Sequence, residues 1–236
     1  MFVKYLKFVG WFTYQIFSGL FPGRKTEPVS GRMPRHEVIN GVISSISASA
    51  YLEIGVNTPN QPGYSRDKIV VPLMHGVDPN PLSQADFVMT SDEFFGSPPP
   101  VFYDVIFIDG LHLFEQCFRD ILNATKLLTE NGLIIVHDTR PVSWRTQTRQ
   151  QGKANKWHGD VWKSILLLRI MRPELKVSTV DTDEGCTIIS KRGGSELLID
   201  DSREIFSWKF FVGNYKEILN LTSVDEFRRE FQPRPD

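Results

Sequence analysis

The chain shows its clearest pattern in residues 103–138, where two apolar runs flank a stretch with helical periodicity. Residues 105–108 and 133–136 are continuously apolar, as in strands that are covered on both faces of a sheet. Between them, apolar side chains recur every three or four residues, which predicts an amphipathic helix ended by the pair Asn131-Gly132. A strand, a helix and a strand of these lengths predict a βαβ unit with parallel strands.

Further segments extend this unit into a larger α/β sheet. Strands are predicted at residues 51–56, 73–77 and 86–89, and a β-hairpin joined through Asp183-Glu184-Gly185 is predicted over residues 175–189. Helices are predicted at residues 36–47, at 92–95 with Ser91 as N-cap, at 160–171 with Asp160 as N-cap, and twice within 200–231.

Length and composition favour one α/β domain with appendages. We divide the 236 residues into an N-terminal aromatic helix and linker (1–34), the α/β domain (35–195) and a C-terminal helical extension (196–236). The chain is 41% apolar and 23% charged, which supports a large core and excludes a disordered protein. The net charge of -1 lacks the basic excess of a nucleic-acid-binding surface, so no nucleic-acid partner is expected.

The cysteines and the N-terminus bear on location and partners. Cys117 and Cys186 lie inside a predicted helix and strand, which indicates buried thiols in a reducing, cytoplasmic compartment. Residues 1–21 are aromatic but are interrupted by Lys4 and Lys7, so they do not predict a membrane-spanning helix. Three interpretations stay open: a helix packed on the domain, a contact in a homo-oligomer, or a peripheral helix at a membrane surface. We favour the first two.

Acidic residues gather where the predicted strands end. Asp109 and Asp138 follow the two strands of the βαβ unit, Glu53 lies near the end of the first strand, and Asp78 follows the second. The carboxyl ends of parallel strands share one edge of a sheet, and open α/β sheets bind ligands at that edge. An acid after the second strand is also placed to hold the ribose of a nucleotide. The sequence therefore predicts a ligand-binding crevice.

Five blocks in this order resemble class I S-adenosylmethionine-dependent methyltransferases: YLEIGV, GVDPNP, MTSDEFF, DVIFIDGLH and IIVHD. The resemblance covers about residues 50–190 and is greatest to a bacterial branch that modifies sugars and glycans. It implies a Rossmann-like, mostly parallel seven-stranded sheet of order 3-2-1-4-5-7-6, with strand seven antiparallel and helices on both faces.

The same resemblance implies a site for the methyl donor, S-adenosylmethionine. The first block would face its methionine part, the second its ribose and the third its adenine. We add the aspartate at the floor of the crevice, so the expected cofactor-binding residues are Glu53, Gly55, Asp78, Ser91, Asp92 and Asp109.

The spacing from Asp109 to His112 resembles magnesium-dependent sugar O-methyltransferases of macrolide pathways. It implies Asp109 and Asp138 as Mg²⁺ ligands and His112, in the first turn of the following helix, as the base that deprotonates the acceptor. Those enzymes carry an acid where this chain has His137. Because imidazole is a poor magnesium ligand, fewer protein ligands, another metal or no metal stay open. The plain alternatives are N-capping by the two aspartates and a surface position for His112.

Two loops affect the expected function. The turn 55–63 carries Pro59 and Pro62 where the family has a compact glycine-rich loop. The segment after Asp138 is rich in basic and aromatic residues: Arg140, Trp144, Arg145, Arg149, Lys153, Lys156 and Trp157. It is either a loop over the crevice that binds the acceptor or an ordinary solvated loop. We expect methylation of a hydroxyl on a sugar or glycan precursor. The alternatives are another reaction on the same fold, or a non-catalytic interaction module that has lost the cofactor loop.

Overall fold

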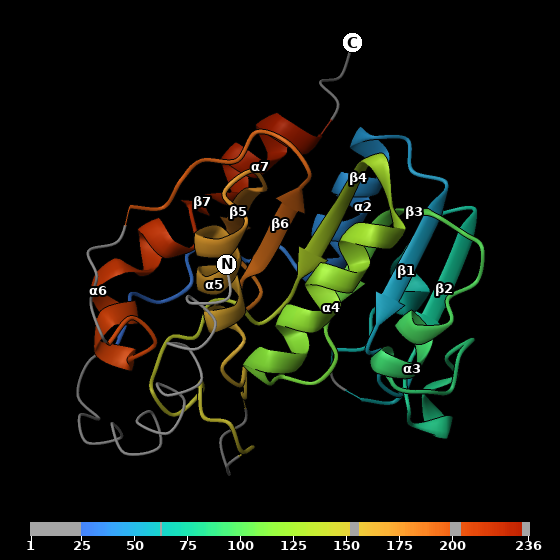
Figure 1. The fold of residues 1–236 in the computed structure, drawn as a ribbon, viewed down its shortest axis with the longest axis horizontal. Helices are drawn as coiled ribbons and strands as arrows, with labels where there is room; N and C mark the ends of the chain where they lie inside the picture. The colour runs from blue at the N-terminus through green and yellow to red at the C-terminus, as the bar shows by residue number, and fades with distance from the viewer. Residues whose placement is uncertain (1–24, 62, 152–155, 199–203, 233–236) are drawn as a thin grey trace.

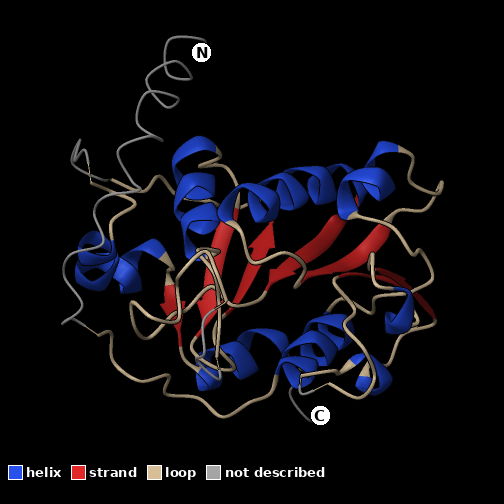
Figure 2. Ribbon diagram, turned by 90° about the horizontal axis from the view of Figure 1, so that it is seen from below, coloured by secondary structure: helices blue, strands red, loops and turns tan. Residues whose placement is uncertain are grey.

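The computed structural model describes residues 25–61, 63–151, 156–198 and 204–232. The aromatic helix expected in residues 1–21 lies outside these ranges, as does Lys153. Within them a twisted sheet forms the centre of the molecule, and helices cover both of its faces (Figures 1 and 2). No helix in the described ranges has both the length and the apolar character needed to cross a bilayer.

The sheet has seven strands in the order β2-β1-β3-β4-β6-β5-β7. β6 is antiparallel to β4 and β5, whereas the other neighbouring strands are parallel. This confirms the mostly parallel Rossmann-like sheet with one antiparallel strand. The strands are β1 (Ala50–Ile54), β2 (Leu73–Val77), β3 (Tyr103–Ile108), β4 (Leu128–Val136), β5 (Lys176–Val180), β6 (Cys186–Ser190) and β7 (Leu221–Thr222).

The two edges of the sheet differ in detail from the expected order. The segment 86–89 keeps its place beside β2 but forms only a single bridge, between Val77 and Phe87. The Asp86 carboxylate accepts the Gly76 N–H at 2.7 Å, so a side chain takes the donor that a longer strand would use. At the opposite edge, β7 from the C-terminal extension pairs with β5.

Two helical layers bury the sheet. α2 and α7 pack on one face, and α4, α5 and α6 pack on the other. Along β3, Ile106 and Ile108 belong to one core while Val105 and Phe107 belong to the other, which is why this run shows no polar alternation. The helices are α2 (Arg35–Ser45), α3 (Ser91–Gly96), α4 (Phe114–Leu127), α5 (Trp162–Met171), α6 (Trp208–Ile218) and α7 (Val224–Phe231), with 3-10 turns at Arg66–Lys68 and Pro81–Ser83.

The predicted end of α4 is wrong. The helix stops at Leu127, and the pair Asn131-Gly132 lies inside β4, because the chain enters the sheet at once by pairing Leu128 with Tyr103. Gly132 serves close packing there and not a left-handed turn. A Cβ on it would lie only 2.9 Å from the carbonyl oxygen of Asp104.

Two predicted N-caps are also wrong. Thr90, one residue before Ser91, caps α3 and forms a reciprocal capping box with Glu93. Asp160 does not cap α5. Its carboxylate accepts the N–H of Phe114 at 2.9 Å and so caps α4, which lies beside α5. The sequence pointed to α5, which follows Asp160 directly along the chain, but in the fold the Asp160 carboxylate faces the start of α4.

Both appendages pack on the domain where they are described. In the N-terminal segment, the backbone N–H groups of Ser30 and Gly31 donate to Asp181, and Met33 is buried. In the C-terminal extension, Phe227 of α7 is buried in the core that α2 also lines. α7 thus completes one layer of the sandwich.

Candidate active site

A crevice of about 960 Å³ lies at the carboxyl ends of the central strands. The register aligns these ends, since Ile54 pairs with both Val77 and Ile108, and Ile108 pairs with Val136. The residue after each strand therefore reaches the same edge. The crevice is lined by every residue expected from the sequence to bind cofactor or metal or to act as base: Glu53, Gly55, Asp78, Ser91, Asp92, Asp109, His112 and Asp138.

Glu53 is the buried acid in the half of the crevice that is expected to bind the cofactor. Glu53 is only 3% exposed, and its Oε2 has no hydrogen-bond partner among the described residues. Burial, partly offset by Arg66, raises the pKa of Glu53 to about 8. A carboxyl group in this state is ready to pair with a cationic ligand.

The turn after β1 is held by Asp78 in place of a glycine-rich loop. Asp78 Oδ2 accepts the N–H groups of Val56 and Asn57, each at 3.0 Å, and its Oδ1 accepts that of Asn80 at 2.8 Å. Gly55 lies at φ +88, and a Cβ there would overlap the backbone of Asp109. Asp78 and Gly55 therefore both have a structural role in this turn, in addition to their place in the crevice.

Gln116 of α4 links this helix to α3, which carries Ser91 and Asp92. Its Nε2 carries two N–H donors and lies within hydrogen-bonding distance of three acceptors: Ser91 Oγ at 3.0 Å, Asp92 Oδ1 at 3.1 Å and Asp120 Oδ1 at 3.0 Å. It also lines the crevice. Sequence reasoning missed this residue, because an amide in the first turn of an amphipathic helix resembles an ordinary solvated position.

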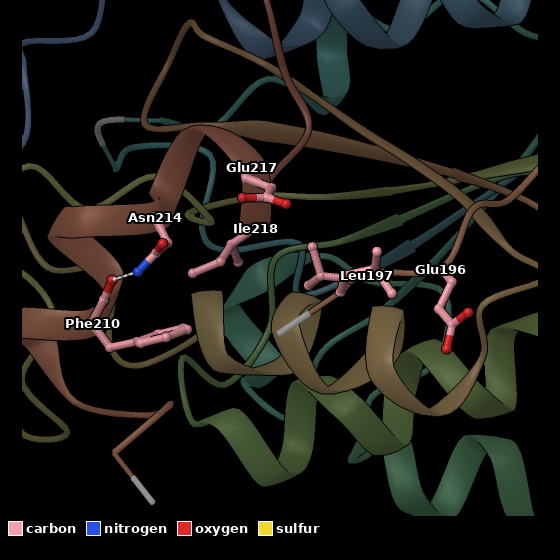
Figure 3. Close-up of a pocket in the computed structure, with 7 residues that line it drawn as sticks. Glu196, Leu197, Phe210, Asn214, Glu217 and Ile218 are labelled. Atoms are coloured by element: carbon pink, nitrogen blue, oxygen red, sulfur yellow. Dashed lines mark hydrogen bonds between the residues drawn. The ribbon is translucent and has the colours of Figure 1, made fainter. Parts of the chain in front are cut away.

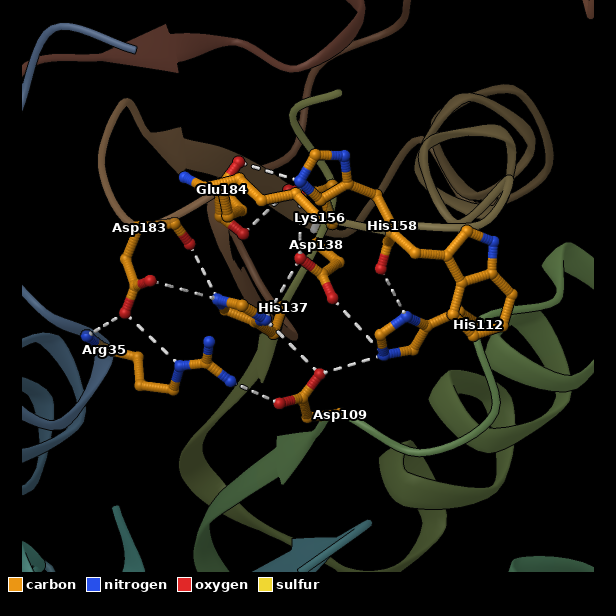
Figure 4. Close-up of polar contacts among 12 residues, drawn as sticks. Arg35, Asp109, His112, His137, Asp138, Lys156, His158, Asp183 and Glu184 are labelled. Carbon is orange, nitrogen blue, oxygen red and sulfur yellow. Dashed lines mark hydrogen bonds and ion pairs between the residues drawn. The ribbon is translucent and has the colours of Figure 1, made fainter. Parts of the chain in front are cut away.

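The acid–base half of the crevice is organised around Asp109 (Figure 4). Its Oδ2 accepts Arg35 Nη1 at 2.5 Å, and its Oδ1 lies 3.3 Å from both His112 Nε2 and His137 Nδ1. Although burial opposes ionisation, the charges of His137 and Arg35 hold the pKa of Asp109 well below its usual range. Asp109 is therefore an anion that faces two imidazoles and a guanidinium.

His112 lies in the loop before α4, not in the first helical turn as predicted from the sequence. Its Nδ1–H donates to the carbonyl oxygen of Trp157 at 3.1 Å, and the two rings stack with centroids 5.0 Å apart. Its Nε2 therefore faces inward, 3.3 Å from Asp109 Oδ1 and 3.3 Å from Asp138 Oδ2. Burial opposes protonation, but these carboxylates outweigh it and raise the pKa of His112 above its ordinary value.

His137 is the more deeply buried imidazole, in a residue that is 2% exposed. Its Nε2–H donates to the carbonyl oxygen of Asp183 at 2.6 Å. Its Nδ1 lies 3.3 Å from Asp109 Oδ1 and 3.4 Å from Asp138 Oδ1 but forms no hydrogen bond among the described residues. Against the effect of burial, Asp138 and Asp109 raise the pKa of His137 well above its ordinary value.

Four further residues complete this half of the crevice and were missed by sequence reasoning. Arg35, at the start of α2, also reaches Asp183 Oδ2 at 3.3 Å, and His158 Nε2 lies 2.7 Å from Glu184 Oε2. One signal was available. β4 ends at the crevice, and β6 runs antiparallel to β4, so β6 begins at that edge. β5 is also antiparallel to β6 and therefore ends there. The turn between β5 and β6, which carries Asp183 and Glu184, must then lie at the crevice.

The basic segment after Asp138 is mostly structural. Arg140 is buried between Asp181, 3.4 Å away, and the ring of Tyr215, whose centroid lies 4.1 Å from its guanidinium carbon. Arg149 pairs with the helix-capping Asp160 at 2.9 Å. Of the basic and aromatic side chains described in this segment, those that line the crevice are Lys156 and Trp157.

A second cavity, of about 570 Å³, shares no lining residue with the crevice. It lies between α6 and the segment after β6, and Leu197, Phe210 and Ile218 supply its apolar wall (Figure 3). Its acidic residues, Glu196 and Glu217, are the ionisable side chains in its lining. It therefore lacks the convergent acid–base groups of the crevice.

Comparisons with known proteins agree with this geometry. A profile described as a methyltransferase domain matches residues 75–139, which run from β2 to just beyond β4. No curated protein sequence matches the chain. The cofactor-bound crystal structure of Rv0187 from MTB is similar at a TM-score of 0.50 and 13% identity, over 71% of this chain and 84% of that one.

Two other solved structures are similar in the same way. TomG from Streptomyces achromogenes, an O-methyltransferase of tomaymycin synthesis in complex with SAM, has 12% identity and a TM-score of 0.48 over 70% of this chain and 82% of its own. An O-methyltransferase from Bacillus cereus in complex with SAH has 16% identity and a TM-score of 0.45 over 69% and 82%.

The sheet order and the matched domain together settle the architecture. The parallel strands end at one crevice, the antiparallel β6 lies beside them, and the domain match spans the strands that carry Asp78, Asp109 and Asp138. The chain therefore has the Rossmann-like α/β fold of methyltransferases.

Proposed function

We propose that the protein transfers a methyl group from S-adenosylmethionine to a hydroxyl group of a sugar or glycan precursor. The observation that carries this proposal is one continuous crevice with two chemically different halves. One half has Glu53, whose Oε2 has no hydrogen-bond partner among the described residues, and the other has the inward-facing Nε2 of His112. A donor site beside an acid–base site is what methyl transfer to an alcohol requires.

The residues of the first half fit the methyl donor. Glu53 offers a buried carboxylate to the positively charged methionine portion, and Asp78 retains acceptor capacity for ribose hydroxyls beyond its three backbone contacts. Ser91, Asp92 and Gln116 supply polar atoms for a base. When bound, S-adenosylmethionine supplies an electrophilic methyl group. The protein's part is to hold that group in line with the acceptor oxygen and exclude water.

His112 is the residue we assign as base. Because Nδ1–H is committed to the Trp157 carbonyl, the neutral ring presents Nε2 as its proton acceptor. Stacking on Trp157 fixes the ring plane. The proton of the acceptor hydroxyl passes to Nε2 as the oxygen attacks the methyl group, so the oxygen need not carry a full negative charge.

The wall beside His112 supports a carbohydrate acceptor. Trp157 gives the crevice an aromatic surface, and Lys156 and Glu184 place charged groups around it. Sites that bind polar ligands combine such an apolar surface with a few polar groups that fix orientation. A sugar ring has the same mixture of an apolar face and a polar rim.

The proposal is tested by incubating the full chain with methyl-labelled S-adenosylmethionine and panels of free sugars and nucleotide-linked sugars. We expect S-adenosylhomocysteine to form only when an accepted sugar is present, with label recovered as an acid-stable methyl ether. Binding of the methyl donor without acceptor-dependent transfer to any hydroxyl compound would contradict the proposal. It would support the non-catalytic interaction module instead.

A further inference from the structure

His137 has a lone pair that faces two anions. Since its Nε2–H is bonded to the Asp183 carbonyl, the neutral ring carries its lone pair on Nδ1. That atom is buried and unpartnered among the described residues, and it points at Asp109 Oδ1 and Asp138 Oδ1 (Figure 4). A lone pair and two carboxylate oxygens at this separation repel one another, so the arrangement calls for a positive charge among them.

The surrounding structure holds the two carboxylates toward this point. Arg35 occupies Oδ2 of Asp109, which leaves Oδ1 for the shared centre. Asp138 lies at φ +58, a left-handed conformation that is strained for a residue with a side chain. Such strain persists where surrounding contacts demand it, often at ligand sites. Asp109, His137 and Asp138 each offer a ligand atom within 4.8 Å of the other two.

This donor set does not fit Mg²⁺, which binds hard oxygen ligands and water. An imidazole nitrogen beside two carboxylates suits Mn²⁺, Fe²⁺, Co²⁺ or Zn²⁺, for which nitrogen–oxygen sites have increasing affinity along the first transition row. The Asp183 carbonyl provides the outer hydrogen bond that orients metal-binding histidines. We propose that Asp109, His137 and Asp138 form a divalent transition-metal site in which His137 excludes Mg²⁺ as the preferred ion.

The inference deepens the proposed methyl transfer, because the site adjoins His112. Only the site's role in catalysis rests on the proposed function, since metal binding by the chain can be measured without methyl donor or acceptor. His112 stays outside the ligand set, because the ligand atoms that lie within 4.8 Å of one another are those of Asp109, His137 and Asp138. Its side chain is also the more exposed of the two imidazoles, at 19% against 1% for His137.

The test is calorimetric titration of the full chain, stripped of metal with a chelator, with Zn²⁺, Co²⁺ and Mg²⁺ in turn. We expect one Zn²⁺ or Co²⁺ per chain, bound at least roughly 100-fold more tightly than Mg²⁺. Bound Co²⁺ should also show the visible absorption bands of a nitrogen-ligated ion. Saturable binding of Mg²⁺ as tight as that of Zn²⁺, or no binding of either transition metal at one per chain, would overturn the proposal. In the second case a protonated His137 is the charge between the carboxylates.

Variants separate this site from other metal-binding groups. His137→Gln keeps an amide that can donate to the Asp183 carbonyl but removes a ligand nitrogen. It should weaken Zn²⁺ binding by at least roughly 100-fold, because losing a residue that only hydrogen-bonds to a metal ligand already costs up to about that much. His137→Glu makes the set all-oxygen and should reverse the preference toward Mg²⁺. His75→Gln, a histidine paired with Tyr103 outside the crevice, should bind as wild type does. Wild-type Zn²⁺ affinity in a folded His137→Gln protein would reject His137 as a ligand.

The two proposals fail separately. If Zn²⁺ binds but S-adenosylmethionine does not, the metal site stands and the proposed methyl transfer falls. If S-adenosylmethionine binds and is used while Zn²⁺ is ignored, the metal inference falls alone.

Discussion

Asp109 connects the two halves of the crevice. Its side chain joins Arg35 on one oxygen and faces both imidazoles on the other, while its N–H donates to Ile54 of β1 at 2.8 Å. Its backbone also packs on Gly55. The N-capping alternative for Asp109 is excluded, because α4 has no side-chain cap from its own N-terminal neighbour and is capped by Asp160.

The role of His112 predicts a specific kinetic change. His112→Ala should lower turnover by roughly 10²–10⁴-fold, because it removes the proton acceptor. The affinity for S-adenosylmethionine should barely change, and Zn²⁺ binding should persist. His75→Gln should keep wild-type turnover, since that histidine lies outside the crevice.

The pH profile makes the assignment sharper. Wild-type turnover should fall with decreasing pH as His112 becomes protonated, and in the metal-free enzyme that limb should lie above pH 6.5, because the neighbouring carboxylates raise the pKa of His112. His112→Ala should lack the limb. An alanine variant with near-normal turnover and an unchanged acid limb would rule His112 out.

Glu53 predicts a change in the pH dependence of stability. The folded-state pKa is raised from 4.5 to about 8, so the native state holds a proton that the unfolded state has lost between these values. Stability from this group is therefore full below about pH 4.5 and declines until about pH 8, by a few kcal/mol at roughly 1.4 kcal/mol per pH unit. Urea unfolding from pH 5 to 9 should show Glu53→Gln with a flatter profile and greater stability at pH 8.

An exposed acid provides the control for this measurement. Glu130→Gln neutralises a carboxylate whose side chain is 63% exposed and which pairs only with surface Arg192 among the described residues, so it should leave the pH profile parallel to wild type. Parallel profiles for Glu53→Gln and wild type would show that Glu53 is ionised at neutral pH in the free protein.

At the scale of elements, the loop that carries His112 is positioned by the chain just before α5. Gly159 lies at φ +59, and a Cβ there would overlap the carbonyl group of His112. The next residue, Asp160, caps α4 immediately after that loop. Two segments far apart in sequence thus fix the position of His112 through one close approach and one hydrogen bond.

Gly159→Ala should therefore damage both stability and turnover. The left-handed backbone alone costs about 1–2 kcal/mol for a residue with a Cβ, equivalent to a decrease in Tm of at least roughly 2 °C for a chain of this size. Displacement of the His112 loop should lower turnover more than that loss of stability explains.

Gly213→Ala is the matched control, because this glycine lies within α6 with no described atom within 4 Å of its Cβ position. It should gain about 0.5–1 kcal/mol. Equal effects of the two substitutions would contradict the account.

The sequence predicted the sheet well, because buried parallel strands are marked by continuous apolar runs and abrupt polar ends. β3 and β4 were predicted from such runs, and the acids at their carboxyl ends lie in the crevice. Helix ends were less predictable. The acceptor that caps α4, Asp160, is 46 residues away from Phe114 along the chain, and no local rule detects it.

The candidate site was predictable only as far as single strands allow. The six residues expected to bind cofactor, and His112, lie at or shortly after the ends of predicted strands, where a local pattern can find them, and all of them line the crevice. Arg35 and Asp183 come from a helix start and a hairpin turn, and only the assembled topology brings them together. His137 was noticed as a departure from the resembling enzymes, but its orientation depends on a hydrogen bond to a carbonyl that sequence cannot reveal.

At the scale of the whole molecule, the appendages extend the domain beyond its sheet. The described C-terminal extension adds β7 to the edge and α7 to one face, so it is part of the folded unit. The role expected for residues 1–21, which lie outside the described ranges, stays a prediction, as do a cytoplasmic location and a homo-oligomer.

Deleting residues 1–21 should leave S-adenosylmethionine binding intact and change oligomeric state or solubility. The reason is that the aromatic stretch lies outside the five blocks that resemble methyltransferases, and the described residues that line the crevice begin at Arg35. Light scattering coupled to size exclusion measures the oligomeric state. Flotation of the full chain with liposomes, lost on deletion, would favour the membrane-surface interpretation over packing or dimerisation.

The most direct test of the central claim is calorimetric titration of the wild-type chain and of Asp78→Ala with S-adenosylmethionine. We expect wild type to bind one molecule per chain. Asp78→Ala should weaken binding by roughly 1.5–3 kcal/mol, because a charge-assisted hydrogen bond to the ribose is lost and the turn after β1 loses its anchor. Absence of binding to the folded wild-type chain would contradict the account, and equal affinity of the two proteins would contradict the place assigned to the cofactor.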